Sequence, residues 1–198
     1  MASGIGFAMS QALLGGVLLA FSRPWRLKHT LYGLLQLGII LYLLEPLHDG
    51  WWWGFIFGSL STAVPGMFWL FSAALFDDRF RLQFWHVGLV AFTVLLPLVG
   101  RALHLSSGDT GYVWLFTVPQ GVEFLLLGFA LFAVARHWNG DLIEERRSLR
   151  TWFCAINGGH LATFLLIREL LFPGESWWSS IQYMSVGVML LVTNALLL

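Results

Sequence analysis

Charged side chains are scarce in this sequence. They make up 11% of the 198 residues, while 58% of the residues are hydrophobic; a soluble domain carries roughly 25% charged residues. So little polar surface cannot cover a water-facing globule, which excludes a soluble secreted protein, a DNA-binding domain and a disordered tail. The 11 Lys and Arg residues balance the 11 Asp and Glu residues, so the net charge indicates neither nucleic acid nor an acidic partner.

Cysteine and lysine each occur once, as Cys154 and Lys28. A single cysteine excludes an intramolecular disulfide and a multi-cysteine metal site. A rhodopsin needs a lysine in its last membrane span to bind retinal, whereas Lys28 lies in a predicted loop near the N-terminus. The sequence therefore excludes a retinal photoreceptor.

Catalytic patterns are also missing. The six histidines form no H-E-x-x-H metal pair, and the sequence has no G-x-S-x-G nucleophile motif. Glu144 and Glu145 resemble the paired glutamates of intramembrane prenyl-protein proteases. That pattern has an arginine four residues after the second glutamate, and Leu149 occupies this position. We therefore expect no enzymatic activity, no metal site and no cofactor.

The sequence does contain seven long apolar stretches. A bilayer core of about 30 Å needs roughly 20 apolar residues in a helix, because the backbone must satisfy its own hydrogen bonds in lipid. The stretches comprise residues 4–22, 30–47, 52–76, 84–103, 112–136, 152–172 and 177–198. They predict an all-α polytopic membrane protein, in which residues 1–198 form a single seven-transmembrane helix bundle.

The basic residues predict how this bundle is oriented. Nine of the 11 follow spans 1, 3 and 5, namely Arg23, Arg26, Lys28, Arg79, Arg81, Arg136, Arg146, Arg147 and Arg150. The other two, Arg101 and Arg168, lie near helix ends on the opposite side. Because cytoplasmic loops are enriched in Lys and Arg, we expect the N-terminus outside and the C-terminus in the cytoplasm.

Span 1 carries a small residue at every fourth position. These residues are Gly4, Ala8, Ala12, Gly16 and Ala20. Small residues let helix backbones approach closely in a membrane. The stripe therefore indicates either a homodimer contact or tight packing inside one bundle.

Three spans are interrupted by proline, at Pro65, Pro97 and Pro119. A proline removes the backbone donor to the carbonyl four residues earlier and tends to kink its helix. The carbonyls affected are those of Ser61, Thr93 and Leu115. We expect kinks at these places, which would suit a bundle that switches between two arrangements.

Polar and ionisable side chains occur in the middle and outer parts of the predicted spans. Each buried ionisable group costs on the order of 2.5–3.5 kcal/mol on insertion scales, so it faces the bundle interior and indicates a partner or a function. The candidate ligand-binding residues are Glu45, Arg101, Gln120, Glu123, Asn157, His160, Arg168 and Gln182. We expect them to line a cavity for a small amphipathic, lipid-like or anionic ligand, or to respond to protonation. The alternative is a set of interhelical hydrogen bonds that only holds the bundle together.

Two further alternatives concern single residues of this set. His160 alone is more typical of a structural hydrogen bond than of a binding site. Glu45 and Arg101 lie near helix ends, where long polar side chains can extend to the membrane surface.

Two predicted cytoplasmic stretches resemble a known family. Phe76-Asp-Asp-Arg-Phe-Arg-Leu-Gln-Phe-Trp-His86 follows the Pro65-Gly-Met-Phe-Trp69 helix, and Arg146-Arg-Ser-Leu-Arg-Thr-Trp-Phe153 leads into a span containing Arg168-Glu-Leu170. With the seven spans, they resemble the N-terminal membrane region of bacterial membrane-bound AraC-type transcriptional regulators. The resemblance implies a sensor in the bacterial inner membrane, followed by a cytoplasmic helix-turn-helix domain. These 198 residues contain no such domain, so we expect contact with DNA only through a domain absent from this chain.

Together these features predict a membrane-embedded sensor or receptor. Its partners would be membrane lipid and a small-molecule or lipid-like ligand, and span 7 would carry the signal to a cytoplasmic transcriptional output. Asp77, Asp78, Arg79 and Arg81 are candidates for coupling to that output, or form a solvated turn whose charges cancel. The alternative function is a small proton-coupled transporter or channel subunit, because interrupted helices and a midplane carboxylate also suit transport.

Overall fold

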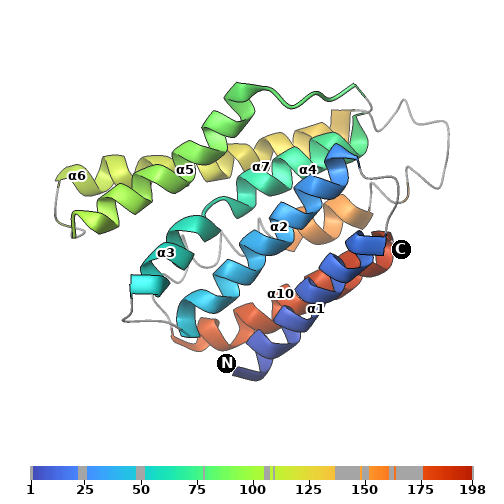
Figure 1. Ribbon diagram of the computed structural model, residues 1–198, viewed down its shortest axis with the longest axis horizontal. Coiled ribbons are helices and arrows are strands. Elements are labelled where there is room, and N and C mark those ends of the chain that lie inside the picture. The colour runs from blue at the N-terminus through green and yellow to red at the C-terminus, as the bar shows by residue number, and fades with distance from the viewer. Residues whose placement is uncertain are drawn as a thin grey trace.

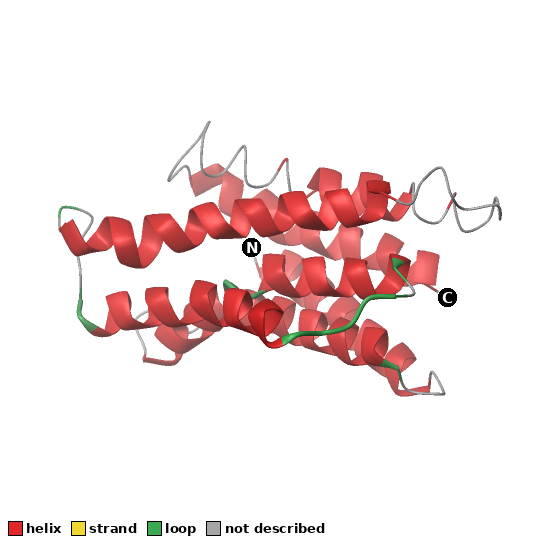
Figure 2. Ribbon diagram, turned by 90° about the horizontal axis from the view of Figure 1, so that it is seen from above, coloured by secondary structure: helices red, strands yellow, loops and turns green. Residues whose placement is uncertain are grey.

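The computed structural model describes residues 2–21, 26–47, 52–77, 79–104, 108, 110–136, 148, 152–160, 163 and 176–197. Within these ranges every regular element is a helix, as Figures 1 and 2 show. The α-helices are α1 (Ala2–Phe21), α2 (Leu27–Leu44), α3 (Trp52–Ser61), α4 (Val64–Phe76), α5 (Phe84–Ala102), α6 (Thr110–Tyr112), α7 (Val118–Arg136) and α10 (Ser176–Leu197). A 3-10 turn (Glu45–Leu47) extends α2, and π-helical turns occupy Val113–Thr117 and Cys154–Gly158. The predicted all-α class is confirmed.

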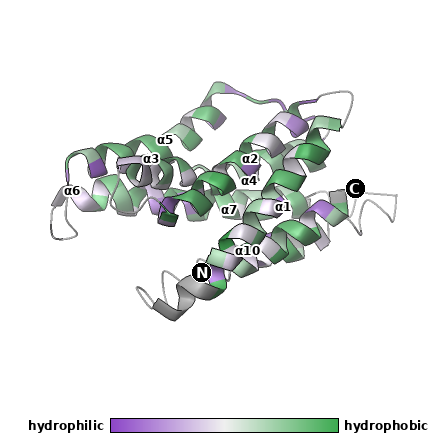
Figure 3. Cartoon of the chain, turned by 60° about the horizontal axis from the view of Figure 1, so that its bottom comes forward, coloured by the Kyte–Doolittle hydropathy of each residue, from purple (hydrophilic) through white to green (hydrophobic). Residues whose placement is uncertain are grey.

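Five helical segments are long and apolar enough to cross a membrane. They are Ala2–Phe21, Leu27–Leu47, Trp52–Phe76, Phe84–Ala102 and Thr110–Ala135, which match the first five predicted spans. Large apolar side chains cover their outer faces, and hydrophobic colour predominates along the helices in Figure 3. Such continuous apolar surface marks contact with lipid rather than water. The chain is a multi-pass membrane protein.

The remaining two predicted spans are described to different extents. Helix α10 lies where the seventh span was predicted, and its apolar part is Ile181–Leu196. Of the predicted sixth span, residues 152–160 and Thr163 are described, and the remaining residues up to 172 lie outside the described residues.

Helices α1 and α10 lie side by side and run in the same direction (Figure 1). A Cβ on Gly4 would lie 3.2 Å from the Met184 backbone nitrogen, and a Cβ on Gly187 would lie 3.1 Å from the backbone nitrogen of Ala8. The small residues of span 1 that face α10 therefore serve packing within the chain.

The rest of the small-residue stripe is placed differently. Ala8 and Ala12 are fully buried, whereas Ala20 is exposed and Gly16 has no described side chain or neighbouring helix within 4 Å of its Cβ position. Helix α10 therefore leaves uncovered only the end of the stripe that contains Gly16 and Ala20. A homodimer through the stripe stays a prediction.

The proline in span 3 divides the helix instead of kinking it. Helix α3 ends at Ser61, Thr62 and Ala63 form a turn, and α4 begins with Pro65 in its first turn, where the missing N–H costs no helical hydrogen bond. The Thr62 hydroxyl lies 2.8 Å from the carbonyl of Thr93, the group that Pro97 deprives of its helical donor. The Ser59 carbonyl lies 2.7 Å from the same hydroxyl, so its one proton is shared between the two carbonyls, and the broken helix supplies part of the hydrogen bonding that the second proline removes.

Replacing Thr62 by valine tests this compensation. The change keeps the side-chain shape and removes the hydroxyl, so the Thr93 carbonyl loses its donor. We expect Thr62→Val to lower the free energy of unfolding by about 1–3 kcal/mol, measured by denaturant unfolding in detergent. Thr117→Val, at an exposed position, is the matched control, and equal stability of the two variants would contradict the account.

Candidate functional site

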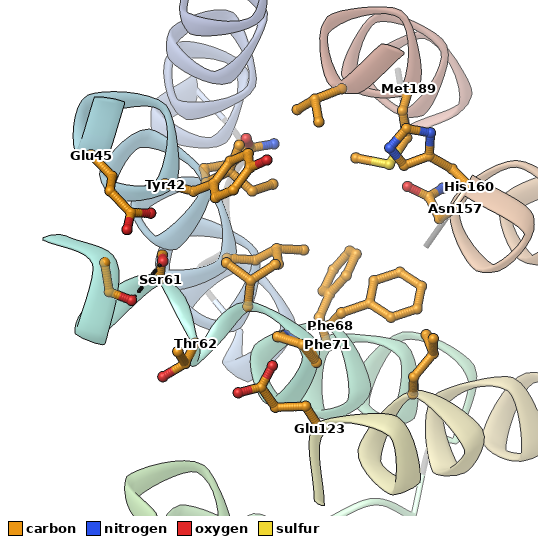
Figure 4. Close-up of a pocket in the computed structure, with 18 of the residues that line it drawn as sticks. Tyr42, Glu45, Ser61, Thr62, Phe68, Phe71, Glu123, Asn157, His160 and Met189 are labelled. Carbon is orange, nitrogen blue, oxygen red and sulfur yellow. Dashed lines mark hydrogen bonds between the residues drawn. The ribbon is translucent and has the colours of Figure 1, made fainter. Parts of the chain in front are cut away.

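A cavity of about 380 Å³ lies between the helices (Figure 4). Its walls come from α2, α3, α4, α5 and α7, from residues 112–116, from residues 153–160 and from α10. This volume is within the range of roughly 300–1,000 Å³ typical of small-molecule sites. The cavity therefore has the size of a ligand site and is formed by segments far apart in the sequence.

Most of the predicted ligand-binding residues line this cavity. The six that do so are Glu45, Arg101, Gln120, Glu123, Asn157 and His160. Gln182 is buried in α10 but is not part of the cavity wall. Arg168 lies outside the described residues. The structure thus brings together six of the eight residues from four different segments of the chain.

One end of the cavity is charged, and we call Glu45, Gly58 and Arg101 its charged end. Arg101 Nη1 donates hydrogen bonds to Ser59 Oγ (3.3 Å) and to the Phe55 carbonyl (3.4 Å). A Cβ on Gly58 would overlap both the Glu45 carboxylate and the Arg101 guanidinium. Both side chains therefore turn toward α3 at a place that only glycine leaves open.

Asn157 lies on the opposite wall, in the π-helical turn Cys154–Gly158. Its Nδ2 donates to the Phe153 carbonyl (3.1 Å), and its Oδ1 accepts from the Thr193 hydroxyl of α10 (2.8 Å). Because both ends of this amide are used within the protein, Asn157 joins its turn to α10. His160 lies beside it and faces the cavity (Figure 4).

Aromatic side chains form the middle of the cavity wall. The ring of Phe153 stacks on Phe68 at a centroid distance of 5.7 Å and meets Phe71 edge-on at 5.8 Å. Phe71 in turn contacts Tyr32 of α2 at 5.1 Å. This wall offers an apolar surface between the charged end and the Asn157 side.

Helix α2 contributes residues that the sequence analysis missed. Gln36, Tyr32 and Tyr42 all line the cavity, and Gln36 is only 2% exposed. The available signal was a polar side chain inside an apolar span with a tyrosine four residues earlier, which places both on one helix face. The uncharged amides Gln120, Asn157 and Gln182 were among the predicted ligand-binding residues, and Gln36 was not.

A buried polar cluster adjoins the cavity behind α2. The Tyr32 hydroxyl donates to Asn194 Oδ1 (2.5 Å), and Asn194 Nδ2 donates to the Gln11 carbonyl (2.9 Å). A Cβ on Gly15 would lie 2.7 Å from Gln36 Nε2. These contacts join α1, α2 and α10 next to the cavity wall.

The predicted coupling residues follow α4. Asp77 Oδ1 accepts a hydrogen bond from the Arg79 backbone N–H (2.9 Å), and the Phe80 N–H donates to the Asp77 carbonyl (3.0 Å). Arg79 and Arg81 are exposed, and Asp78 lies outside the described residues. Asp77 therefore stabilises its own turn, and coupling through this segment stays a prediction.

Two further findings concern metal binding and similarity to known proteins. The described part of the chain contains no group of three or more His, Cys, Asp or Glu side chains that could hold a metal ion. No family model, curated protein or solved structure matches this chain. The resemblance to membrane-bound AraC-type regulators therefore stays a prediction.

The charged end leaves no room for a side chain at Gly58. We expect Gly58→Ala to destabilise the protein by about 1–3 kcal/mol, because the added methyl group forces the Glu45 and Arg101 side chains apart. The matched control is Gly88→Ala on α5, whose Cβ position has no described neighbour outside its own helix within 4 Å. There the better helix propensity of alanine gives equal or greater stability. Thermal unfolding in detergent measures both, and a Gly58→Ala protein as stable as the control would contradict this packing.

Proposed function

We propose that the protein is a membrane-embedded sensor that binds an amphipathic ligand in the cavity between its helices. The observation that carries the proposal is the cavity itself, with a charged end and an aromatic wall. An apolar pocket with a few convergent polar groups is the usual form of a small-molecule site. The proposal includes no catalytic step.

The directions of the described helices support a seven-span arrangement. Helix α4 runs parallel to α7, since Gly66 faces Leu126 and Trp69 faces Phe129. Helix α10 runs parallel to α1, and α7 ends at the opposite end of the bundle from the start of α10 (Figure 1). With the distribution of basic residues, this arrangement supports an external N-terminus and a cytoplasmic C-terminus.

Helix α10 is placed to transmit occupancy of the cavity. It contributes Val186, Met189, Leu190 and Thr193 to the wall, so a ligand contacts this helix directly. A ligand shifts a conformational equilibrium only by its difference in affinity for the two states. A tenfold preference supplies about 1.4 kcal/mol. In the proposal, the sensor lies in the bacterial inner membrane, and α10 transmits this shift between conformations to a cytoplasmic transcriptional output.

A pair of valines on α10 tests whether the cavity binds a ligand. Val186 is buried and lines the cavity, whereas Val188 is 49% exposed on the outer surface. We expect Val186→Phe to fill part of the cavity and to abolish labelling of its wall by a photoreactive dodecanol in lipid nanodiscs. Labelled peptides are identified by mass spectrometry.

Val188→Phe carries the same substitution on the lipid-facing side and is the matched control. We expect it to leave labelling of the cavity wall unchanged, with competition by unlabelled dodecanol as in the wild type. Equal labelling of the two variants would contradict ligand binding in the cavity.

The second candidate is a small proton-coupled transporter or channel subunit. The observation that favours it is the break between α3 and α4, because Ser61 and Thr62 beside the break line the cavity and transporters place their sites at such discontinuous helices. Proton flux in reconstituted vesicles that Glu123→Gln removes would favour transport. Binding without flux would favour the sensor.

A further inference from the structure

The cavity is long and narrow. On α2, the residues that line it recur on one helix face from Tyr32 to Glu45, which corresponds to about 20 Å along the helix axis. The segment from Tyr112 to Leu127, which ends in α7, lines the cavity over a similar length. The volume of about 380 Å³, spread over about 20 Å, gives a mean cross-section of about 20 Å². This cross-section is the width of one extended hydrocarbon chain.

The two ends of the cavity differ in chemistry. Glu45, in the charged end, lies at one limit of the α2 face, and Tyr32 lies at the other limit. The Tyr32 ring contacts Phe71 at 5.1 Å, and Phe71 meets Phe153 edge-on at 5.8 Å. We call Tyr32, Phe71 and Phe153 the aromatic end. A ligand that fills the cavity therefore meets charges at one end and rings at the other.

Polar side chains near the aromatic end bond one another. The Tyr32 hydroxyl donates to Asn194 Oδ1 (2.5 Å), and the Thr193 hydroxyl donates to Asn157 Oδ1 (2.8 Å). The polar atoms of Gln36 have almost no accessible surface, so this amide does not face a ligand. The aromatic end thus offers mainly an apolar surface.

Glu123 and His160 also face the cavity (Figure 4). Glu123 lies about one helical turn before Leu127, and His160 lies about two turns after Phe153. Both are therefore displaced from the aromatic end toward the middle of the cavity. Polar contacts are available to a ligand from the charged end to this point, and hydrocarbon suits the remainder.

From the length, the width and the two ends, we propose that the cavity binds a lipid-like molecule with a single unbranched hydrocarbon chain. Its polar head lies at the charged end, and its methyl end lies against the aromatic end. A two-chain phospholipid and a sterol ring system are both too wide for this cross-section. This inference rests on the proposed function and names the ligand class of the same site.

Fit, rather than hydrophobicity, selects such a ligand. In a bilayer the chain is already surrounded by hydrocarbon, so its transfer into the cavity gains no hydrophobic free energy. It gains dispersion contacts with walls that otherwise face empty space. A chain that is too short leaves part of the cavity empty, and one that is too long does not fit. The inference therefore predicts an optimum chain length.

Competition in lipid nanodiscs that hold the full chain tests the length and the width. Photoreactive dodecanol labels the cavity wall, and unlabelled alcohols compete at equal mole fraction. The extended length of hexadecanol is close to that of the cavity, so we expect it to compete about tenfold more strongly than octanol or docosanol. Its branched isomer hexyldecanol has the same hydrocarbon content at greater width, and we expect it not to compete.

Two neighbouring leucines of α10 test whether the wall sets this optimum. Leu190 is 2% exposed and lines the cavity, whereas Leu191 is 44% exposed on the outer surface. Leu190 lies one turn before Asn194, which bonds Tyr32 at the aromatic end. We expect Leu190→Phe to shorten the cavity and move the optimum to dodecanol, and Leu190→Ala to lengthen it and move the optimum beyond hexadecanol. Leu191→Phe is the matched control and keeps the wild-type optimum.

Two photoreactive hexadecanols test the orientation of the ligand. One carries a diazirine next to the hydroxyl group, and the other carries it at the methyl end. We expect the first to label peptides that contain Glu45 or Arg101, and the second to label peptides that contain Tyr32 or Phe153. The reverse pattern would overturn the proposed orientation.

The outcomes separate this inference from the proposed function. Equal competition by hexadecanol and hexyldecanol, lost for both in Val186→Phe, would overturn the single chain and leave the ligand site standing. An optimum that stays at hexadecanol in both Leu190 variants would overturn it as well. If no alcohol competes and Val186→Phe is labelled like Val188→Phe, the proposed function itself is wrong.

Discussion

The structure depends on one constraint: in hydrocarbon, polar groups of the backbone and side chains must find their partners within the protein. Departures from regular helix therefore occur where a partner is at hand. The Thr62 hydroxyl reaches the Thr93 carbonyl that Pro97 leaves without a donor, and Asn157 holds the π-helical turn in which it lies. The irregular segments are joined to one another across the bundle.

The same constraint applies to the side chains around the cavity. Hydrogen bonds of Asn157 and Asn194 connect α10 to its neighbours on two sides, so the helix is anchored next to a space that it helps to line. Gln36 is also buried on this wall, and its Nε2 lies next to Gly15 of α1, close to the Tyr32–Asn194 hydrogen bond. A cavity that is charged at one end and aromatic along its wall has the form of a small-molecule site.

Hydropathy was enough to predict the helices, because lipid demands long apolar segments whatever the packing. The first five predicted spans agree with the structure within a few residues. The break at Thr62 was not predicted, since a proline pattern does not distinguish a kink from a new helix start. That choice depends on the partner that Thr62 finds on α5.

The site was predictable only in part. The cost of burying ionisable groups identified Glu45, Arg101, Glu123 and His160, which converge on the cavity. Helix faces could not be assigned between spans, so Gln182 was included although it does not line the cavity. Gln36 was missed although other uncharged amides were included, because its place on the cavity wall depends on how α2 is rotated in the bundle.

The central claim is that the cavity holds a ligand rather than empty space. The most direct measurement is a crystal structure of the chain grown from a lipid phase containing dodecanol. The account predicts continuous elongated density inside the cavity, along Phe68 and Phe71. A cavity closed by its own side chains, or one that holds only water, would contradict the account.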